Sequence, residues 1–250
     1  MKKYRFCLIA LMLFTSIGTF AQKNLGDYIE INGVPAFVFY LDQSKEHGLA
    51  MSIPALDAKG VKEVDKMVKK GLLTAEQGNI LKNNLIGEYN SQGIAGKKSK
   101  DLFENLMGKL TDSGKSNQEQ ISAYCNEQGI QLAEVFPLQS WAKGLGEGWY
   151  IPGDQELIWF TEFYSGGLGK KNGMGAKFYN QAKKLSDNEL IQNSLMQIVH
   201  GGLFSSTAKN ADGGFRKLRT EMIRMPMTLY FDLFDTTISN NMRVCAVHEF

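Results

Sequence analysis

Hydrophobic and polar positions alternate near the start of the chain and then recur at helical spacing. Residues 36–41 are rich in strand-forming side chains, residues 42–46 are polar, and residues 49–53 are apolar again. This order predicts a β-hairpin over residues 36–53, with residues 33–35 as its entry turn. His47 lies at the base of the second strand, where local hydrogen bonding is expected of it rather than metal binding.

Residues 56–110 change to a helical pattern. The apolar residues from Val61 to Leu72 fall on one helical face, Gly71 follows, and residues 74–77 form a capping box that opens a second helix. A third amphipathic segment extends from Leu102 to Leu110. The many lysines of this region are interleaved with acids and amides, so we expect a solvated face rather than a binding patch. We therefore predict a helical insertion in a domain that also contains strands.

The second half of the chain predicts more helices and returns to strands at its end. A capping box at residues 116–119 opens one helix, residues 130–147 read as a loop that carries Trp141, and another helix follows Pro152. Residues 186–189 cap a further helix. The glycine-rich residues 165–175 lack a phosphate-binding pattern and are expected to form loops. Strands are predicted at residues 202–207, 227–233 and 242–248.

The first 21 residues have the pattern of a secretory signal peptide. A basic head is followed by a short apolar stretch and by small residues, so cleavage is expected after Ala21. Removal of this segment leaves 25 basic and 26 acidic residues and a formal charge of −1. The expected mature chain, residues 22–250, is a single domain without a membrane span. It is periplasmic, displayed on the cell surface or secreted, and its charge does not favour nucleic-acid binding.

Two cysteines remain after this cleavage, Cys125 and Cys245. In an oxidising compartment a disulfide between them would close a loop of about 120 residues and stabilise the fold by roughly 4–5 kcal/mol. Two free buried thiols are the alternative.

The residues that commonly support catalysis do not form a recognisable pattern. The three histidines, His47, His200 and His248, are far apart in sequence, and Ser205 and Ser206 lack the nucleophile-elbow pattern. Glu156 and Glu162 are paired carboxylates, but their spacing is also that of an ordinary helix. We expect no catalytic residue, no metal and no cofactor.

Four blocks of residues, in the same order, resemble the C-terminal domain family of Legionella collagen-like proteins and its relatives, among them the Fibrobacter major paralogous domain. The first block is residues 38–42 with 47–49, and the second is residues 149–152 with Glu156-Leu157. The third is residues 204–207 and the fourth is residues 243–247. The motif positions expected to be structural are Trp149, Pro152, Glu156, Ser205 and Ser206.

The resemblance implies an α+β, C-type-lectin-like fold with antiparallel strands, flanking helices and the helical insertion. It also implies a disulfide bond between a cysteine on an early helix and a cysteine on the last strand. The positions of Cys125 and Cys245 match this pair, so we expect a Cys125–Cys245 disulfide. Phe204 and Gly153 depart from the family pattern, where Trp and Ser or Thr are usual. The calcium-dependent sugar motifs of C-type lectins are absent. Asp235, Asn240 and Asn241 precede the last strand as candidate oxygen ligands, and a polar turn is the alternative.

These observations together predict an exported binding protein that recognises a glycan or a surface protein through its loops. Trp141 is the aromatic residue chosen for stacking on a ligand, although a place in the core is an equally good interpretation. The alternatives are an envelope assembly protein acting through the helical insertion, or an enzyme related to the formylglycine-generating sulfatase modifiers.

Overall fold

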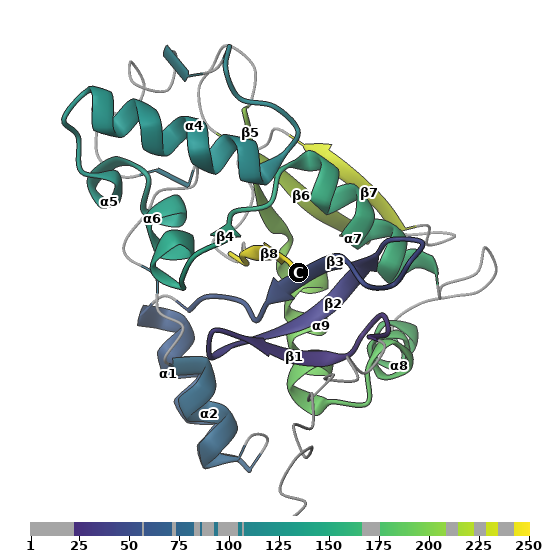
Figure 1. Cartoon of the computed structure of the whole chain (residues 1–250). Coiled ribbons are helices and arrows are strands. Elements are labelled where there is room, and N and C mark those ends of the chain that lie inside the picture. The colour runs from purple at the N-terminus through teal and green to yellow at the C-terminus, as the bar shows by residue number, and fades with distance from the viewer. Residues whose placement is uncertain are drawn as a thin grey trace, which may run out of the picture.

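The computed structural model describes residues 23–250 except 57, 72–73, 83–85, 87–92, 95–104, 107, 167–175, 209–214, 223–228 and 235–242. The expected signal peptide lies outside the described residues. The described part is a mixed α+β structure with an antiparallel sheet and several helices (Figure 1). None of its helices is long and apolar enough to cross a membrane.

The larger sheet has five antiparallel strands in the order β1-β2-β3-β8-β4. Its members are β1 (Tyr28–Ile31), β2 (Val34–Leu41), β3 (Gly48–Ser52), β4 (Trp149–Tyr150) and β8 (Val247–Glu249). The last strand of the chain therefore lies between the hairpin β2–β3 and the two-residue strand β4. Ser52 fastens the entry to β8, because its N–H donates to the Ala246 carbonyl and its hydroxyl accepts from the Ala246 N–H at 2.9 Å.

The hairpin predicted over residues 36–53 is confirmed, but an additional strand precedes it. Asn32 and Gly33 both have positive φ, 55° and 78°, and they connect β1 to β2 as a two-residue turn. Asn-Gly is the preferred sequence for such a turn, because both central residues need this backbone conformation. The expected entry turn at residues 33–35 is therefore wrong, and Val34 and Pro35 already belong to β2.

A smaller sheet contains β5 (Leu203–Ala208), β6 (Phe215–Met222) and β7 (Leu229–Phe234) in that order. Strand β6 was not predicted from the sequence. An isolated parallel bridge from Leu203 to Arg243 connects the first strand of this sheet to the segment that leads into β8.

Two described helices confirm the predicted helical pattern after β3. They are α1 (Ala58–Lys69) and α2 (Ala75–Lys82), and the capping box holds because Thr74 and Gln77 exchange hydrogen bonds at 2.9 and 3.1 Å. Most of the third predicted segment, residues 102–110, lies outside the described residues.

The other helices are α4 (Gly114–Glu127), α5 (Leu132–Val135), α6 (Pro137–Gly144), α7 (Asp154–Gly166), α8 (Ala176–Leu185) and α9 (Glu189–Gly201). Helix α4 begins earlier than predicted, because Ser113 and not Ser116 is its N-cap. The loop expected at residues 130–147 is wrong, since most of it forms α5 and α6; Pro137 is a favourable first residue for α6.

The two faces of the five-stranded sheet pack against different helices. The main core lies on one face and includes Phe37, Phe39, Met51 and Val247 together with apolar residues of α7 and α9. The second core lies on the other face, where Ala36, Ala50, Ala246 and Trp149 pack against Leu138 and Ala142 of α6. A third core joins α4 and α5 to Phe136.

The expected Cys125–Cys245 disulfide is not present in the structure. Cys125 belongs to the third core and Cys245 to the main core, and both are free, buried thiols. Burial raises the pKa of both thiols, so each is held in its less nucleophilic protonated form. This arrangement corresponds to the alternative of two free thiols, and it does not favour cysteine chemistry.

Candidate functional site

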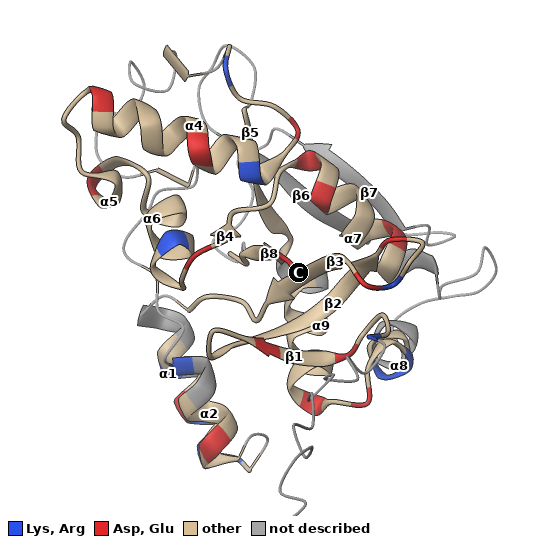
Figure 2. Cartoon of the chain, viewed as in Figure 1, with Lys and Arg blue, Asp and Glu red and all other residues tan. Residues whose placement is uncertain are grey.

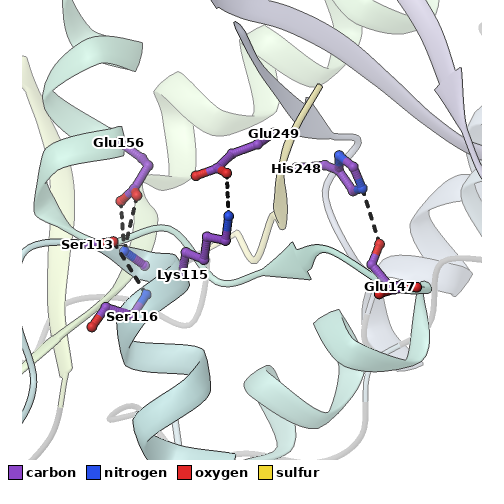
Figure 3. Close-up of polar contacts among 8 residues, drawn as sticks. Ser113, Lys115, Ser116, Glu147, Glu156, His248 and Glu249 are labelled. Atoms are coloured by element: carbon purple, nitrogen blue, oxygen red, sulfur yellow. Dashed lines mark hydrogen bonds and ion pairs between the residues drawn. The ribbon is translucent and has the colours of Figure 1, made fainter. Parts of the chain in front are cut away.

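The motif residues between β4 and α7 form a buried polar network with the start of α4 and with β5. Glu156 is 4% exposed, and its carboxylate accepts hydrogen bonds from the N–H groups of Gly153 at 2.7 Å and of Gly114 at 3.0 and 3.1 Å. Figure 3 shows this carboxylate directed at the N-terminus of α4. Glu156 thus satisfies backbone donors that a helix N-terminus leaves without partners.

Two glycines make this contact possible. A Cβ on Gly153 would lie 2.2 Å from the Asp112 carbonyl oxygen, and a Cβ on Gly114 would lie 2.4 Å from the Ile151 carbonyl oxygen. Both distances are far shorter than any real Cβ contact, so the two backbone segments can pass each other only as glycines. This close approach therefore requires glycine at both positions.

Asn117 connects α4 to β5. Its side chain is fully buried, its Oδ1 accepts from the Thr111 N–H at 2.7 Å, and its Nδ2 donates to the Thr111 carbonyl at 2.8 Å and to Ser206 at 3.1 Å. The Ser206 hydroxyl in turn donates to the Ile151 carbonyl, and the Ser206 N–H donates to the Pro152 carbonyl at 2.6 Å.

Asp154 and the neighbouring hydroxyls of β5 complete the network. The Ser205 hydroxyl donates to the Asp154 carboxylate at 2.7 Å, and the Thr207 hydroxyl accepts from the Asp154 N–H at 2.9 Å. The sequence did not indicate that Asn117, Asp154 and Thr207 belong to one network. A signal was nevertheless present, since Asp154 directly follows the Pro-Gly pair and Thr207 directly follows Ser206.

This network holds three chain segments together, and its polar side chains are shielded from solvent. Trp149, Pro152, Glu156, Ser205 and Ser206 are all buried. Burial raises the pKa of Glu156, and the carboxylate of Glu249 acts in the same direction, whereas the N–H donors of Gly114 and Gly153 oppose the shift. Burial likewise raises the pKa of Tyr150, so its phenol is neutral beside the two acids.

Beside this network the surface carries one ion pair. Lys115 at the start of α4 lies 2.5 Å from the carboxylate of Glu249 on β8, and both side chains are about half exposed (Figure 3). The Glu249 carboxylate raises the pKa of Lys115. The pair joins the last strand to α4, but an exposed ion pair of this kind contributes only about 0–1 kcal/mol.

A second set of polar groups lies where α6 leads into β4, and two of their buried nitrogen atoms have no hydrogen-bond partner. We call Asn32, Trp141, residues 146–149 and His248 the α6–β4 corner. His248 and Trp149 are directly opposite each other on β8 and β4, with their ring centroids 5.2 Å apart. The Trp149 Nε1 and the His248 Nδ1 are buried without hydrogen-bond partners.

The glycines of this corner bring the polar side chains close to the backbone. A Cβ on Gly148, which has a φ of 84°, would lie 2.6 Å from the His248 Nε2. A Cβ on Gly146 would lie 3.5 Å from the Asn32 Nδ2 and 3.8 Å from the Trp149 Cδ1. The turn of the first hairpin therefore meets the end of α6 at this corner.

Trp141 belongs to this corner but not in the way the sequence suggested. It lies on α6 and not in a loop, and it is half-buried against the second core, as is Leu145. Its role in ligand stacking stays a prediction. The other candidate ligand residues, Asp235, Asn240 and Asn241, lie outside the described residues.

The described residues contain no group of three or more His, Cys, Asp or Glu side chains that could hold a metal ion. Comparison of the chain with protein-family models, with curated proteins and with solved structures finds no match.

Proposed function

We propose that this protein is an exported, non-catalytic carbohydrate-binding protein with a C-type-lectin-like fold. The fold proposal is supported by the antiparallel sheet in which the terminal strand β8 pairs with the N-terminal hairpin, and by the helices packed on both of its faces. Export is proposed on the N-terminal sequence pattern alone.

The observation that carries the binding proposal is the composition of the α6–β4 corner. The half-buried Trp141 packs against the same small core as Trp149. Trp149 in turn contacts His248, and it lies near Asn32 across Gly146, so side chains that can donate and accept hydrogen bonds adjoin this core. Sugars present apolar ring faces and hydroxyl groups together, so binding sites for them combine an aromatic surface with a few polar groups.

The motif acids support a structural role rather than a catalytic one. Glu156 and Asp154 are buried and already accept hydrogen bonds from the protein itself. A catalytic acid has to reach a proton on a substrate, whereas these carboxylates face the backbone of α4 and the hydroxyls of β5.

A glycan array with the mature protein, residues 22–250, tests the proposal. We expect retention on a subset of glycans, and loss of at least tenfold in affinity for Trp141→Ala at unchanged secondary structure. Trp159→Ala is the control, because Trp159 stacks on Tyr40 at a different place, with ring centroids 4.5 Å apart. Equal affinities of the wild type and Trp141→Ala would remove Trp141 from the site.

The array also separates the proposal from a protein partner. Absence of any glycan signal, together with binding to intact cells that is lost after protease treatment of those cells, would replace the carbohydrate by a surface protein.

A further inference from the structure

Strand β1 is the outermost strand of the larger sheet and pairs only with β2 among the described strands (Figure 1). The two-residue turn after it makes Ile31 and Val34 the closing hydrogen-bonded pair of the hairpin. Such pairs alternate along an antiparallel ladder, so the N–H and carbonyl groups of Tyr28 and Glu30 point away from β2. In the described part of the chain, no residue hydrogen-bonds to these four groups.

The side chains of β1 divide between the two faces of the sheet. Tyr28 packs against the main core, and its hydroxyl donates to the Glu30 carboxylate at 2.8 Å. Burial raises the pKa of Tyr28 to about 12, and this hydrogen bond acts in the same direction, so the phenol is a donor at neutral pH. Ile29 and Ile31 lie on the other face, where both are half-buried against the second core.

A second copy of this edge can satisfy all four outward groups in one antiparallel register only. With a two-fold axis at Ile29, Tyr28 lies opposite Glu30 of the second copy, and the reverse pair forms as well. Each of these pairs exchanges two backbone hydrogen bonds. An axis at Tyr28 or at Glu30 would form only one such pair, and an axis at Glu30 would also place two carboxylates opposite each other.

The side chains match in the same register. Glu30 is the one charged residue of β1, and Figure 2 shows no basic position on this strand. Opposite each Glu30 carboxylate lies a Tyr28 phenol, which is a neutral donor and brings no like charge. The two Ile29 side chains meet at the axis and extend the second core from one copy into the other. The Lys, Pro and bulges that commonly block an edge are absent from β1.

The neighbours of β1 limit the ladder to these residues. A Cβ on Gly26 would overlap the Leu185 carbonyl at the end of α8, so a second strand cannot continue past this point. The hairpin turn ends the strand after Ile31. Because four backbone hydrogen bonds make a short ladder, the expected dimer is weak and forms at high protein concentration.

We propose that two copies of this protein pair antiparallel through β1 about a two-fold axis at Ile29, which joins their five-stranded sheets into one continuous sheet. This assembly is independent of the proposed carbohydrate-binding function and does not require a ligand.

Cysteine substitution at the axis tests the pairing in the mature protein, residues 22–250. The Cα atoms of a non-hydrogen-bonded antiparallel pair are about 4.5 Å apart, which suits a disulfide. We therefore expect Ile29→Cys to form a disulfide-linked dimer under mild oxidation. Ile31→Cys is the matched control on the same face, because its two copies would be about 14 Å apart along the strands. The wild type, whose Cys125 and Cys245 are buried, gives the background.

Selective cross-linking of Ile29→Cys is the expected result. Cross-linking of both variants to the same extent, or of neither variant, would overturn the proposal.

Glu30→Pro tests the backbone pairing without a new thiol. Proline lacks the N–H that points away from β2, so the variant blocks the edge and leaves the β1–β2 ladder intact. Sedimentation velocity at rising concentration should show a dimer for the wild type and a monomer for Glu30→Pro, with the fold checked by circular dichroism. Glu30→Gln is the control, because its amide oxygen still accepts from Tyr28, and it should dimerise like the wild type.

A wild type that stays monomeric at every concentration overturns the proposal, and so does an undiminished dimer of folded Glu30→Pro. If the proline variant does not fold, the comparison of Ile29→Cys with Ile31→Cys decides alone.

Discussion

The polar network between α4, β5 and the start of α7 contrasts with the polar groups packed around α6. In the network, Asn117, Asp154, Glu156, Ser205 and Ser206 are buried, and each makes hydrogen bonds. Around α6, Gln139 is fully buried with both amide atoms unpartnered, and the Gln118 Oε1 next to it also lacks a partner.

The difference separates two uses of buried polar side chains. A group with all its partners fixes the relative position of chain segments, and its removal leaves other groups unsatisfied. A group without partners stabilises nothing by hydrogen bonding, and its replacement by an apolar side chain of similar shape costs little. Substitutions in the two regions should therefore differ in sign.

Gly153→Ser should give the largest effect. The new Cβ would lie 2.2 Å from the Asp112 carbonyl oxygen, so the backbone of the network has to separate. We expect the free energy of unfolding to fall by about 3 kcal/mol or more, since overpacking against backbone cannot be relieved by a rotamer change. Chemical denaturation measures it, and the control is Gly144→Ser on α6, where a Cβ meets nothing within 4 Å. Equal stability of the two variants would refute the close approach.

Asn117→Asp tests the network by exchanging one atom. The new carboxylate oxygen would replace the Nδ2 that donates to the carbonyls of Thr111 and Ser206, so acceptors would face acceptors. We expect a loss of about 2–3 kcal/mol in unfolding free energy. Gln120→Glu on the exposed side of the same helix is the control and should change stability by less than about 0.5 kcal/mol. A loss no larger than the control's would show that Asn117 does not connect α4 to β5.

Glu156→Gln should cost about 1–2 kcal/mol, because one of the two oxygens that accept backbone N–H groups becomes a donor. The contribution of Glu156 to the free energy of unfolding also depends on pH, in a direction that its raised pKa determines. The folded-state pKa of Glu156 is raised, so its contribution to stability is fully present below the ordinary glutamate pKa and is lost as pH rises through the raised value. The wild type should thus lose more stability than the variant between acidic and neutral pH. Parallel curves of unfolding free energy against pH would contradict the raised pKa.

Gln139→Met should give the smallest effect and the opposite sign. It removes two unpartnered amide atoms and keeps the length of the side chain, so we expect unchanged stability or a gain of up to about 1 kcal/mol. Thermal unfolding of the variant beside Gln139→Ala, which leaves a cavity, measures the difference. A loss of more than about 1 kcal/mol would show that the Gln139 amide has a partner after all.

Local patterns predicted much of the fold, and contacts between distant segments escaped prediction. The hairpin β2–β3, the capping box at Thr74 and strand β7 follow from periodicity and capping, which involve neighbours in sequence. Helix α6 was missed because it has only eight residues, and Pro137 at its start and Gly144 at its end are also typical of loops. The disulfide was expected from the compartment and the resemblance, neither of which gives the distance between two side chains.

The α6–β4 corner was only partly predictable. Trp141 could be chosen as a partly exposed aromatic residue because glycines follow it in the sequence. The approach of Asn32 to Gly146, 114 positions later, depends on how the sheet is assembled. The unpartnered state of Trp149 and His248 is likewise a property of packing, which no sequence motif encodes.

Strand β8 places the last residues of the chain in the interior of the larger sheet, between β3 and β4. The sheet therefore cannot close until β8 is available, and β8 is separated from β3 by nearly 200 residues. Pairing over such a distance in sequence slows folding, since the entropy of closing the chain is lost before the contacts form. Loss of the final residues would leave β3 and β4 as open edges. A chain truncated before β8 is therefore expected to aggregate rather than to fold.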